Sequence, residues 1–292
     1  MRLFLNKLII FLVCSLTLVT LFLLIEKKYY LNNYHYFNEQ FDCFLISDSY
    51  GNALGENTQQ FGLYNFSAPS ESYCDMLIKL KYLVENSTPQ KIFISVDDHN
   101  LSEYREKYNN YEKSIFLDKP NNYKNIFDYL KVVWIDNLYF NQEMKAVIQN
   151  TILNELVNAF SSKKNFKENK LSFAQLPDEK KARKIGGSIS AIFLNKKKSK
   201  LIENCFLQII SYCKQNDIQL IALKFPITKI YYDQIKRMGF FPKELIVKNN
   251  IEFYDYTDIY FDNDSLFYNH NHLNKIGAEK FNEILKIKFF SN

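Results

Sequence analysis

The chain of 292 residues has only five cysteines, and no two of them form a C-x-x-C pair. Structural metal sites and dithiol redox motifs need closely spaced cysteines, so neither is indicated. The four cysteines beyond the N-terminal apolar run each lie in an apolar strand or helix pattern. Free cysteine is among the most buried residue types. We therefore expect buried free thiols, in preference to a disulfide or a metal site, at Cys43, Cys74, Cys205 and Cys213.

The chain also lacks a strong excess of either charge. Its 37 Lys and Arg against 32 Asp and Glu give a net charge of +5. No recognisable nucleic-acid-binding module is present, so a nucleic-acid partner is not expected. Lysine-rich runs at Ser161–Lys170, Lys180–Lys184 and Lys196–Lys198 predict solvated faces, with contact to anionic lipid heads or an anionic glycan as the alternative.

One long stretch near the N-terminus has no charged residue. At about 1.5 Å per residue, Leu8–Ile25 reaches about 27 Å as a helix, close to the thickness of a bilayer core. No small-x-small cleavage site follows it, which favours an uncleaved anchor over a signal peptide. Val13 before Cys14 argues against a lipoprotein site. Positive residues stand on both sides, so they orient the helix only weakly. We predict a single-pass anchor and linker over residues 1–40, with the domain outside the cytoplasm.

Residues 41–292 show the rhythm of one α/β domain. Apolar periodicity predicts helices between the strands and at the C-terminus, and their alternation with strands is typical of a doubly wound parallel sheet. The predicted strands are Phe44–Ile46, Phe61–Phe66, Lys91–Val96, Ile218–Phe225 and Ile251–Tyr254. The predicted helices are Asp75–Val84, Leu201–Lys214 with its start at Lys196–Lys198, Ile230–Met238 and Asn274–Phe290.

The strand rhythm stops between Leu101 and Lys200. An all-helical insertion over about 101–200 is predicted there, with helices at Tyr123–Phe140 and Gln142–Phe160. Such an insertion often covers a site as a lid or shapes a groove. Gly186-Gly187 is its candidate hinge.

Two polar blocks stand where a ligand site is expected. Ser47-Asp48-Ser49-Tyr50-Gly51 follows the first strand, and its glycine permits a sharp turn. The carboxyl ends of the strands are where open α/β sheets bind ligands. A plain turn with a Ser or Asp helix cap is the simplest interpretation. The second block, Asn269-His270-Asn271-His272, stands just before the last predicted helix and can fold back over the same edge.

Together the two blocks resemble the SGNH (GDSL-like) hydrolase superfamily. In that family the nucleophile lies in a Gly-Asp-Ser turn after the first strand, and the base lies in an Asp-x-x-His block before the last helix. The resemblance covers roughly residues 41–290 with a dissimilar middle. It implies a flavodoxin-like three-layer α/β fold, with Ser49 as nucleophile, His272 as base, and no metal or organic cofactor. His270 is a second candidate base, and a helix cap is the structural alternative for His272.

The first departure from the family concerns the group that orients the base. Asn269 stands where the family has an aspartate. An amide can hold an imidazole but cannot offset the charge of the imidazolium that forms during attack. The base therefore works slowly in a Ser-His dyad, or the fold is kept for binding only, or a carboxylate substitutes from among Asp255, Asp258, Asp262 and Asp264.

The second departure concerns the oxyanion hole, which needs fixed donors aimed at developing charge. The family uses a glycine N–H after the second strand and an asparagine after the third. Here Ala68-Pro69-Ser70 and Asn100 stand near those places, and proline has no N–H. The resemblance implies the N–H groups of Ser49 and Ser70 and the side chain of Asn100 as donors. Capping of the next helix explains Asn100 equally well, and His99 is a lesser candidate.

The resemblance also suggests a function, because membrane-tethered members commonly modify envelope polysaccharides. It implies a membrane-anchored, extracytoplasmic serine esterase or O-acyltransferase that acts on a cell-surface polysaccharide. The partners expected are a glycan or acyl ester substrate and the membrane. The alternative is a catalytically impaired SGNH-like protein that binds glycan or a partner in envelope assembly. A third hypothesis is a cytosolic-facing domain that uses its lysines on anionic lipid.

Overall fold

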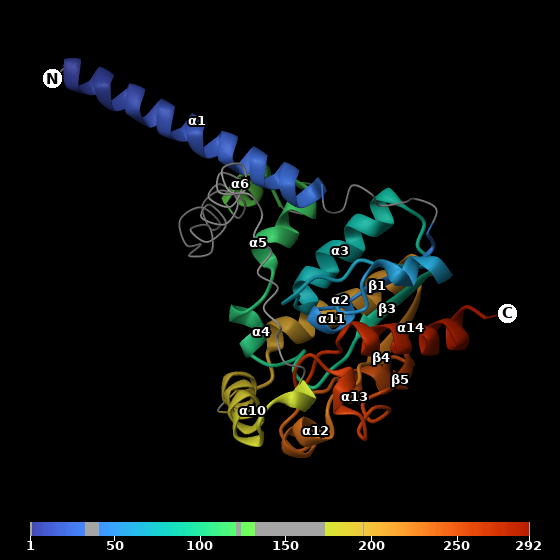
Figure 1. The fold of residues 1–292 in the computed structure, drawn as a ribbon. Coiled ribbons are helices and arrows are strands. Elements are labelled where there is room, and N and C mark those ends of the chain that lie inside the picture. The colour runs from blue at the N-terminus through green and yellow to red at the C-terminus, as the bar shows by residue number, and fades with distance from the viewer. Residues whose placement is uncertain (1, 33–40, 121–123, 132–172, 195, 292) are drawn as a thin grey trace, which may run out of the picture.

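The computed structural model describes residues 2–32, 41–120, 124–131, 173–194 and 196–291. Helix α1 (Arg2–Asn32) extends away from the sheet and its covering helices as one long rod (Figure 1). Its stretch Leu3–Leu21 is long and apolar enough to cross a membrane and is not buried. The hydroxyls of Thr17 and Thr20 bond to carbonyls of their own helix, which satisfies them without water. A helix with the length and composition of a membrane span is therefore confirmed at the N-terminus.

Five parallel strands form one sheet in the order β2-β1-β3-β4-β5. This is the flavodoxin-like order, which reverses direction between β1 and β3 and places ligands in the crevice at that point. It confirms the predicted α/β class. The strands are β1 (Cys43–Ile46), β2 (Leu63–Asn65), β3 (Lys91–Ser95), β4 (Gln219–Lys224) and β5 (Glu252–Asp255).

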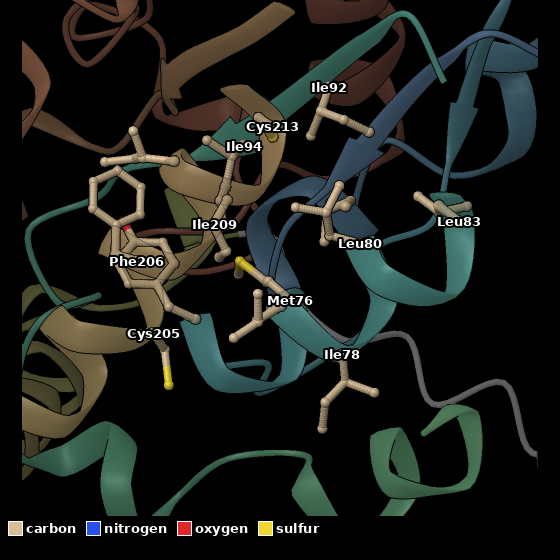
Figure 2. Packing of buried hydrophobic residues seen from close by; sticks show 14 of the residues in the cluster. Met76, Ile78, Leu80, Leu83, Ile92, Ile94, Cys205, Phe206, Ile209 and Cys213 are labelled. Carbon is tan, nitrogen blue, oxygen red and sulfur yellow. The ribbon is translucent and has the colours of Figure 1, made fainter. Parts of the chain in front are cut away.

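Alternate residues of the central strands face two separate cores, because side chains alternate along a strand. Ile92 and Ile94 of β3 face the core covered by α3 (Tyr73–Asn86) and α11 (Lys200–Gln215). Figure 2 shows them with side chains of both helices. Phe93, between them, faces the other core, which α12 (Lys229–Ile235) and α14 (Lys275–Phe289) help to cover. Both faces of the sheet are thus buried, as the apolar strands predicted.

A disulfide joins Cys74 of α3 to Cys205 of α11. The prediction of free thiols is wrong for these two residues. Packing of the two helices brings their Cα atoms to 5.0 Å, although they are 131 residues apart in the sequence. Cys43 and Cys213 are free, and Cys213 is buried. Spacing along the chain gave no sign of a contact that exists only after both helices dock on the sheet.

The remaining helices lie in the connections between these elements. They are α2 (Ser49–Asn52), η1 (Glu56–Phe61), α4 (Tyr104–Lys107), α5 (Tyr111–Ser114), η2 (Ile115–Leu117), α6 (Ile126–Leu130), η6 (Phe173–Gln175), α10 (Asp178–Ile192), α13 (Lys243–Lys248) and η7 (Asp264–Leu266). Apart from α6, the predicted helices at Tyr123–Phe140 and Gln142–Phe160 lie largely outside the described residues.

Three local predictions are wrong. Gly186-Gly187, the candidate hinge, lies inside α10 and not in a loop. Lys196–Lys198 does not begin α11, because the side chain of Ser199 accepts from the N–H of Ile202 and caps the helix one step later. The second strand is shorter than predicted, because Gly62 ends η1 with a φ of 90° just before it.

Candidate active site

Ser49 lies at the start of helix α2, directly beyond the carboxyl end of β1. Asp48 is the N-cap of this helix, and its Oδ1 accepts from the N–H of Tyr50 at 3.0 Å. The simplest interpretation of the turn, an aspartate helix cap, is therefore confirmed. It is compatible with a reactive serine, because the cap fixes the direction in which Ser49 leaves the sheet.

Gly51 is needed for space and not for the backbone turn that the sequence suggested. Its φ is not positive. A Cβ atom at this position would lie 2.5 Å from the Cβ of Ser47 and 2.8 Å from the Oγ of Ser67. Ser67 follows β2, so the missing side chain lets α2 sit against the ends of two neighbouring strands.

His272 reaches the same edge of the sheet from the other end of the chain. Its Nε2 lies 2.7 Å from the Oγ of Ser49. The main-chain N–H of Tyr268 donates to the carbonyl of His272, and this closes the loop that carries it. The cap of α14 is Asn274, which accepts from the N–H of Gly277. The structure therefore gives the helix-cap role to Asn274 and leaves the His272 ring to Ser49.

Two amide oxygens hold the other ring nitrogen of His272. The Nδ1 atom lies 3.0 Å from Asn269 Oδ1 and 2.8 Å from Asn271 Oδ1. Asn269 Oδ1 also accepts from the main-chain N–H groups of Asn271 and His272. An atom that accepts two N–H donors must be the amide oxygen, so Nδ1 carries the ring proton. The Nε2 lone pair is then left for the hydroxyl proton of Ser49.

No carboxylate takes this place within the described part of the chain. Asp255 accepts from the N–H of Thr257, and Asp264 lies 3.7 Å from Lys181. No contact to His272 is seen for Asp258 or Asp262 among the described residues. The hypothesis that one of these four aspartates replaces the missing carboxylate is therefore not supported by the structure.

The ring of His272 is neutral near neutral pH. Burial lowers its pKa to about 4, the nearby Asp48 carboxylate raises it in part, and His99 and Arg105 lower it again. A neutral imidazole with a free Nε2 is the form that a general base requires. The ring of His270 packs against that of Tyr231 at 4.6 Å between centroids and has no hydrogen-bond partner within the described residues.

A charged cluster lies behind the serine. Asp48 Oδ2 accepts from His99 Nε2 at 2.6 Å and from Arg105 Nη2 at 2.7 Å, and its side chain is fully buried. Burial by itself would raise the pKa of Asp48, but His99, Arg105 and the N–H of Tyr50 together lower it below its usual value. For Asp97 burial and the charge of Asp48 raise the pKa well above its usual value. Burial and neighbouring charges thus move the pKa values of these two carboxyl groups in opposite directions.

The sequence did not indicate this cluster. Asp48 was visible only as a possible cap, and His99 only as a lesser oxyanion donor. Arg105 comes from α4 in the insertion, where no motif marked it. A buried aspartate next to a candidate nucleophile needs positive partners, and that requirement was the one signal available.

The predicted oxyanion donors lie at the same edge of the sheet. The N–H of Ser49 begins α2 and has no acceptor within the helix. Ser70 is exposed, in the loop after β2, with a φ of 64°. The N–H of Ala68, by contrast, already donates to Ser47 and Glu71. Oδ1 of Asn100 accepts from the N–H of Asp97 in its own loop, so its Nδ2 is the group left to donate.

The structure brings Ser49, His272 and Asn269 into one hydrogen-bonded group. For Ser70 and Asn100 it gives no bond to Ser49 in the described residues, and their roles stay predictions. Asn100 does not cap the next helix, because the residue before α4 is Glu103. Within the described ranges no three His, Cys, Asp or Glu side chains are grouped so as to hold a metal ion.

No family model and no curated protein matches the chain. Solved structures do match. One is a GDSL-like lipase from Bacteroides thetaiotaomicron, with 9% identity over 84% of this chain and 85% of that chain and a TM-score of 0.37. Another is the psychrotrophic esterase EstA from Pseudoalteromonas sp., with 10% identity over 84% of this chain and 95% of that chain and a TM-score of 0.34. At such low similarity, the chemistry of the site rests on the contacts of its own residues.

Proposed function

We propose that this α/β chain of the SGNH type is a serine esterase or O-acyltransferase. The observation that carries the proposal is the 2.7 Å contact between His272 Nε2 and Ser49 Oγ, with Nδ1 held by two amide oxygens. An activated serine needs a base within hydrogen-bond reach and a third group that orients the base. All three are present at the edge of the sheet where α/β folds bind ligands.

The geometry supports a two-step acyl transfer. Ser49 Oγ attacks the carbonyl carbon of an ester while His272 Nε2 takes the hydroxyl proton. The carbonyl oxygen becomes an oxyanion, which the N–H of Ser49 and the predicted donors on Ser70 and Asn100 stabilise. The C–O bond to the leaving alcohol then breaks, and His272 returns the proton to that alcohol. Water or a sugar hydroxyl attacks the acyl-serine in the second step, and this choice separates an esterase from a transferase.

The proposed location is the outer face of a membrane, with residues 1–40 as anchor and 41–292 as the catalytic domain. The length and composition of helix α1 support the anchor, although a signal sequence would share both. The lack of a cleavage site after it favours a helix that stays attached to the chain. The Cys74–Cys205 disulfide supports the outer face, because disulfides persist in oxidising compartments and are rare in the cytosol. A cell-surface polysaccharide is the proposed acyl donor or acceptor, from the resemblance to membrane-tethered SGNH proteins.

The activity is tested with the full chain in detergent. A fluorophosphonate, which labels activated serines whatever their substrate, and an aryl acetate serve as probes. We expect labelling and slow turnover by the wild type, and neither by Ser49→Ala. Ser211→Ala, an exposed serine on α11, is the matched control and should behave as the wild type. Labelling that survives Ser49→Ala would show that another residue reacts.

A binding protein without hydrolytic activity is the second candidate. It is favoured by one observation, that both acceptors at His272 Nδ1 are neutral. A wild type that neither labels nor turns over, while its fold is intact, would support this candidate and remove the enzyme.

The location is tested by protease treatment of intact spheroplasts. We expect digestion of the domain, and alkylation without reductant should leave Cys74 and Cys205 unmodified. Complete protection from protease would contradict the outer location.

A further inference from the structure

Asn271 is held at both ends of its amide. Its Oδ1 lies 2.8 Å from His272 Nδ1, and its Nδ2 donates to the hydroxyl oxygen of Tyr50 at 2.8 Å. The side chain is buried. An amide has two unlike ends of similar size, so only one of its two orientations offers an oxygen to the Nδ1 proton. The group that holds Nδ2 therefore decides whether Asn271 supports the base or opposes it.

Asn269 and Asn271 differ in what fixes their orientation. Main-chain N–H groups of Asn271 and His272 hold the oxygen of Asn269, and no side-chain substitution removes them. The orientation of the Asn271 amide depends on side chains alone, those of Tyr50 and His272. Asn271 is therefore the amide whose orientation a side-chain substitution can change.

Tyr50 is well placed for this contact because it follows Ser49 in α2. Its ring is buried and meets the ring of His272 edge-on, with 5.0 Å between centroids. Burial raises the pKa of Tyr50 well above its usual value, so the group stays a neutral phenol. A phenol oxygen can accept from Asn271 while its own proton is donated elsewhere.

A small buried cavity adjoins the Tyr50 side chain. Asp97 and Tyr231 also line it, and Asp97 Oδ2 and the Tyr231 hydroxyl have no hydrogen-bond partner within the described residues. The cavity holds about 10 Å³ for the centre of a water molecule, which is roughly the space of one water. One water in this polar cavity would accept the Tyr50 proton and leave the Tyr50 lone pair to Asn271.

We propose that Tyr50 is a positioning residue for the base. Its hydroxyl holds Asn271 so that the amide oxygen faces the Nδ1 proton of His272. Two amide dipoles then face the positive charge that develops on the imidazole, in place of the single carboxylate of the SGNH pattern. This role rests on the proposed serine chemistry, and it gives the residue after the nucleophile a function of its own.

The test is a double-mutant cycle on the rate at which a fluorophosphonate labels Ser49 in the full chain in detergent. Tyr50→Phe should lower the rate by about threefold to tenfold, the usual worth of one hydrogen bond. In an Asn271→Asp background either carboxylate oxygen can accept the Nδ1 proton, so Tyr50→Phe should there cost less than about twofold. The control is Tyr73→Phe, which removes another buried hydroxyl, bonded to the Ser95 carbonyl. Its rate should stay within about twofold of the wild type.

Equal losses from Tyr50→Phe in both backgrounds would overturn the proposal, because Tyr50 would then act only through packing. A rate unchanged by Tyr50→Phe would overturn it as well. Should Tyr50→Phe fail to fold, Asn271→Leu removes both ends of the amide at similar volume and must show a loss of at least the same size. A wild type no more reactive than Ser49→Ala would instead remove the serine chemistry itself.

Discussion

The site contains two histidines that differ in what holds them. His99 donates to a buried carboxylate, that of Asp48, which Arg105 shares. His272, which contacts the serine, is held by two neutral amides. The aspartate that the SGNH pattern places three residues before the base is thus replaced by Asn269. The buried aspartate of this site, Asp48, is bonded to the histidine that does not contact Ser49.

This difference shows that orienting the base and stabilising its positively charged form are separate tasks. Amide oxygens fix the tautomer of His272 as well as a carboxylate would, because main-chain donors prevent Asn269 from turning over. They do not supply the negative charge that steadies an imidazolium. The charge of Asp48 lies instead beside the serine, where the Arg105 guanidinium offsets it and His99 forms a hydrogen bond to it. These contacts support the turn that carries Ser49.

Removal of each histidine in turn should separate the two roles most strongly. His272→Ala removes the base, and we expect fluorophosphonate labelling of Ser49 to fall by roughly a thousandfold or more. His99→Gln keeps a donor for Asp48 and should cost less than about tenfold. Labelling rates of both variants, with circular dichroism as a check on folding, decide the matter. If His99→Gln lowered the labelling rate more than His272→Ala does, His99 would be the base and His272 the supporting residue.

Loss of the charge on Asp48 should damage stability. Asp48→Asn can still cap α2 but leaves the buried Arg105 guanidinium without its counter-charge. Removal of one partner of a buried ion pair costs about 3–5 kcal/mol in the free energy of unfolding. Asp233→Asn, in an exposed pair with Lys236, is the control and should leave the denaturant midpoint of unfolding nearly unchanged. If Asp48→Asn changed the free energy of unfolding only slightly, the Arg105 guanidinium would have to be hydrated in the variant.

A carboxylate at position 269 should supply the negative charge that the two amides lack. Asn269→Asp keeps the acceptor for two N–H groups and places a negative charge at His272 Nδ1. In serine proteases the reverse change costs about ten-thousandfold, chiefly through the wrong tautomer. Here the tautomer is already right, so only the charge is gained and we expect labelling to rise about tenfold, equal to one pKa unit. Asn263→Asp puts an exposed carboxylate on the other side of η7, in the same connection between β5 and α14, and is the control. No rise with the fold intact would favour the binding protein.

Local apolar patterns in the sequence predicted the sheet, and the resemblance of two short polar blocks to the SGNH family predicted the Ser49–His272 pair. Phe44–Ile46 and Lys91–Ser95 are apolar runs that end in polar turns, and Asn274 caps a helix with ordinary periodicity. Such signals are complete within a few residues, and the fold only has to bring them to one edge.

The contacts that the sequence did not predict all join distant segments. The Cys74–Cys205 bridge depends on how two helices dock, and the Asp48–Arg105 pair depends on a turn of the insertion. The hydrogen bond from Asn271 to Tyr50 spans 221 residues. None of these partners has a fixed spacing that physical chemistry demands, so no pattern in one sequence could mark them.

The pH dependence is the finest test of the comparison between the two histidines. Because burial lowers the pKa of His272 to about 4, the neutral base is lost only when pH falls through that value. The labelling rate of the wild type should therefore rise with a midpoint near pH 4 and stay level through neutral pH. Asp48 raises this pKa while His99 and Arg105 lower it, so these charges set the midpoint together with burial. Asn269→Asp stabilises the imidazolium and should move the midpoint up by about one unit or more. A wild-type midpoint of 6 to 7, the range of a hydrated imidazole, would mean that water reaches His272 and that the amides do not enclose it.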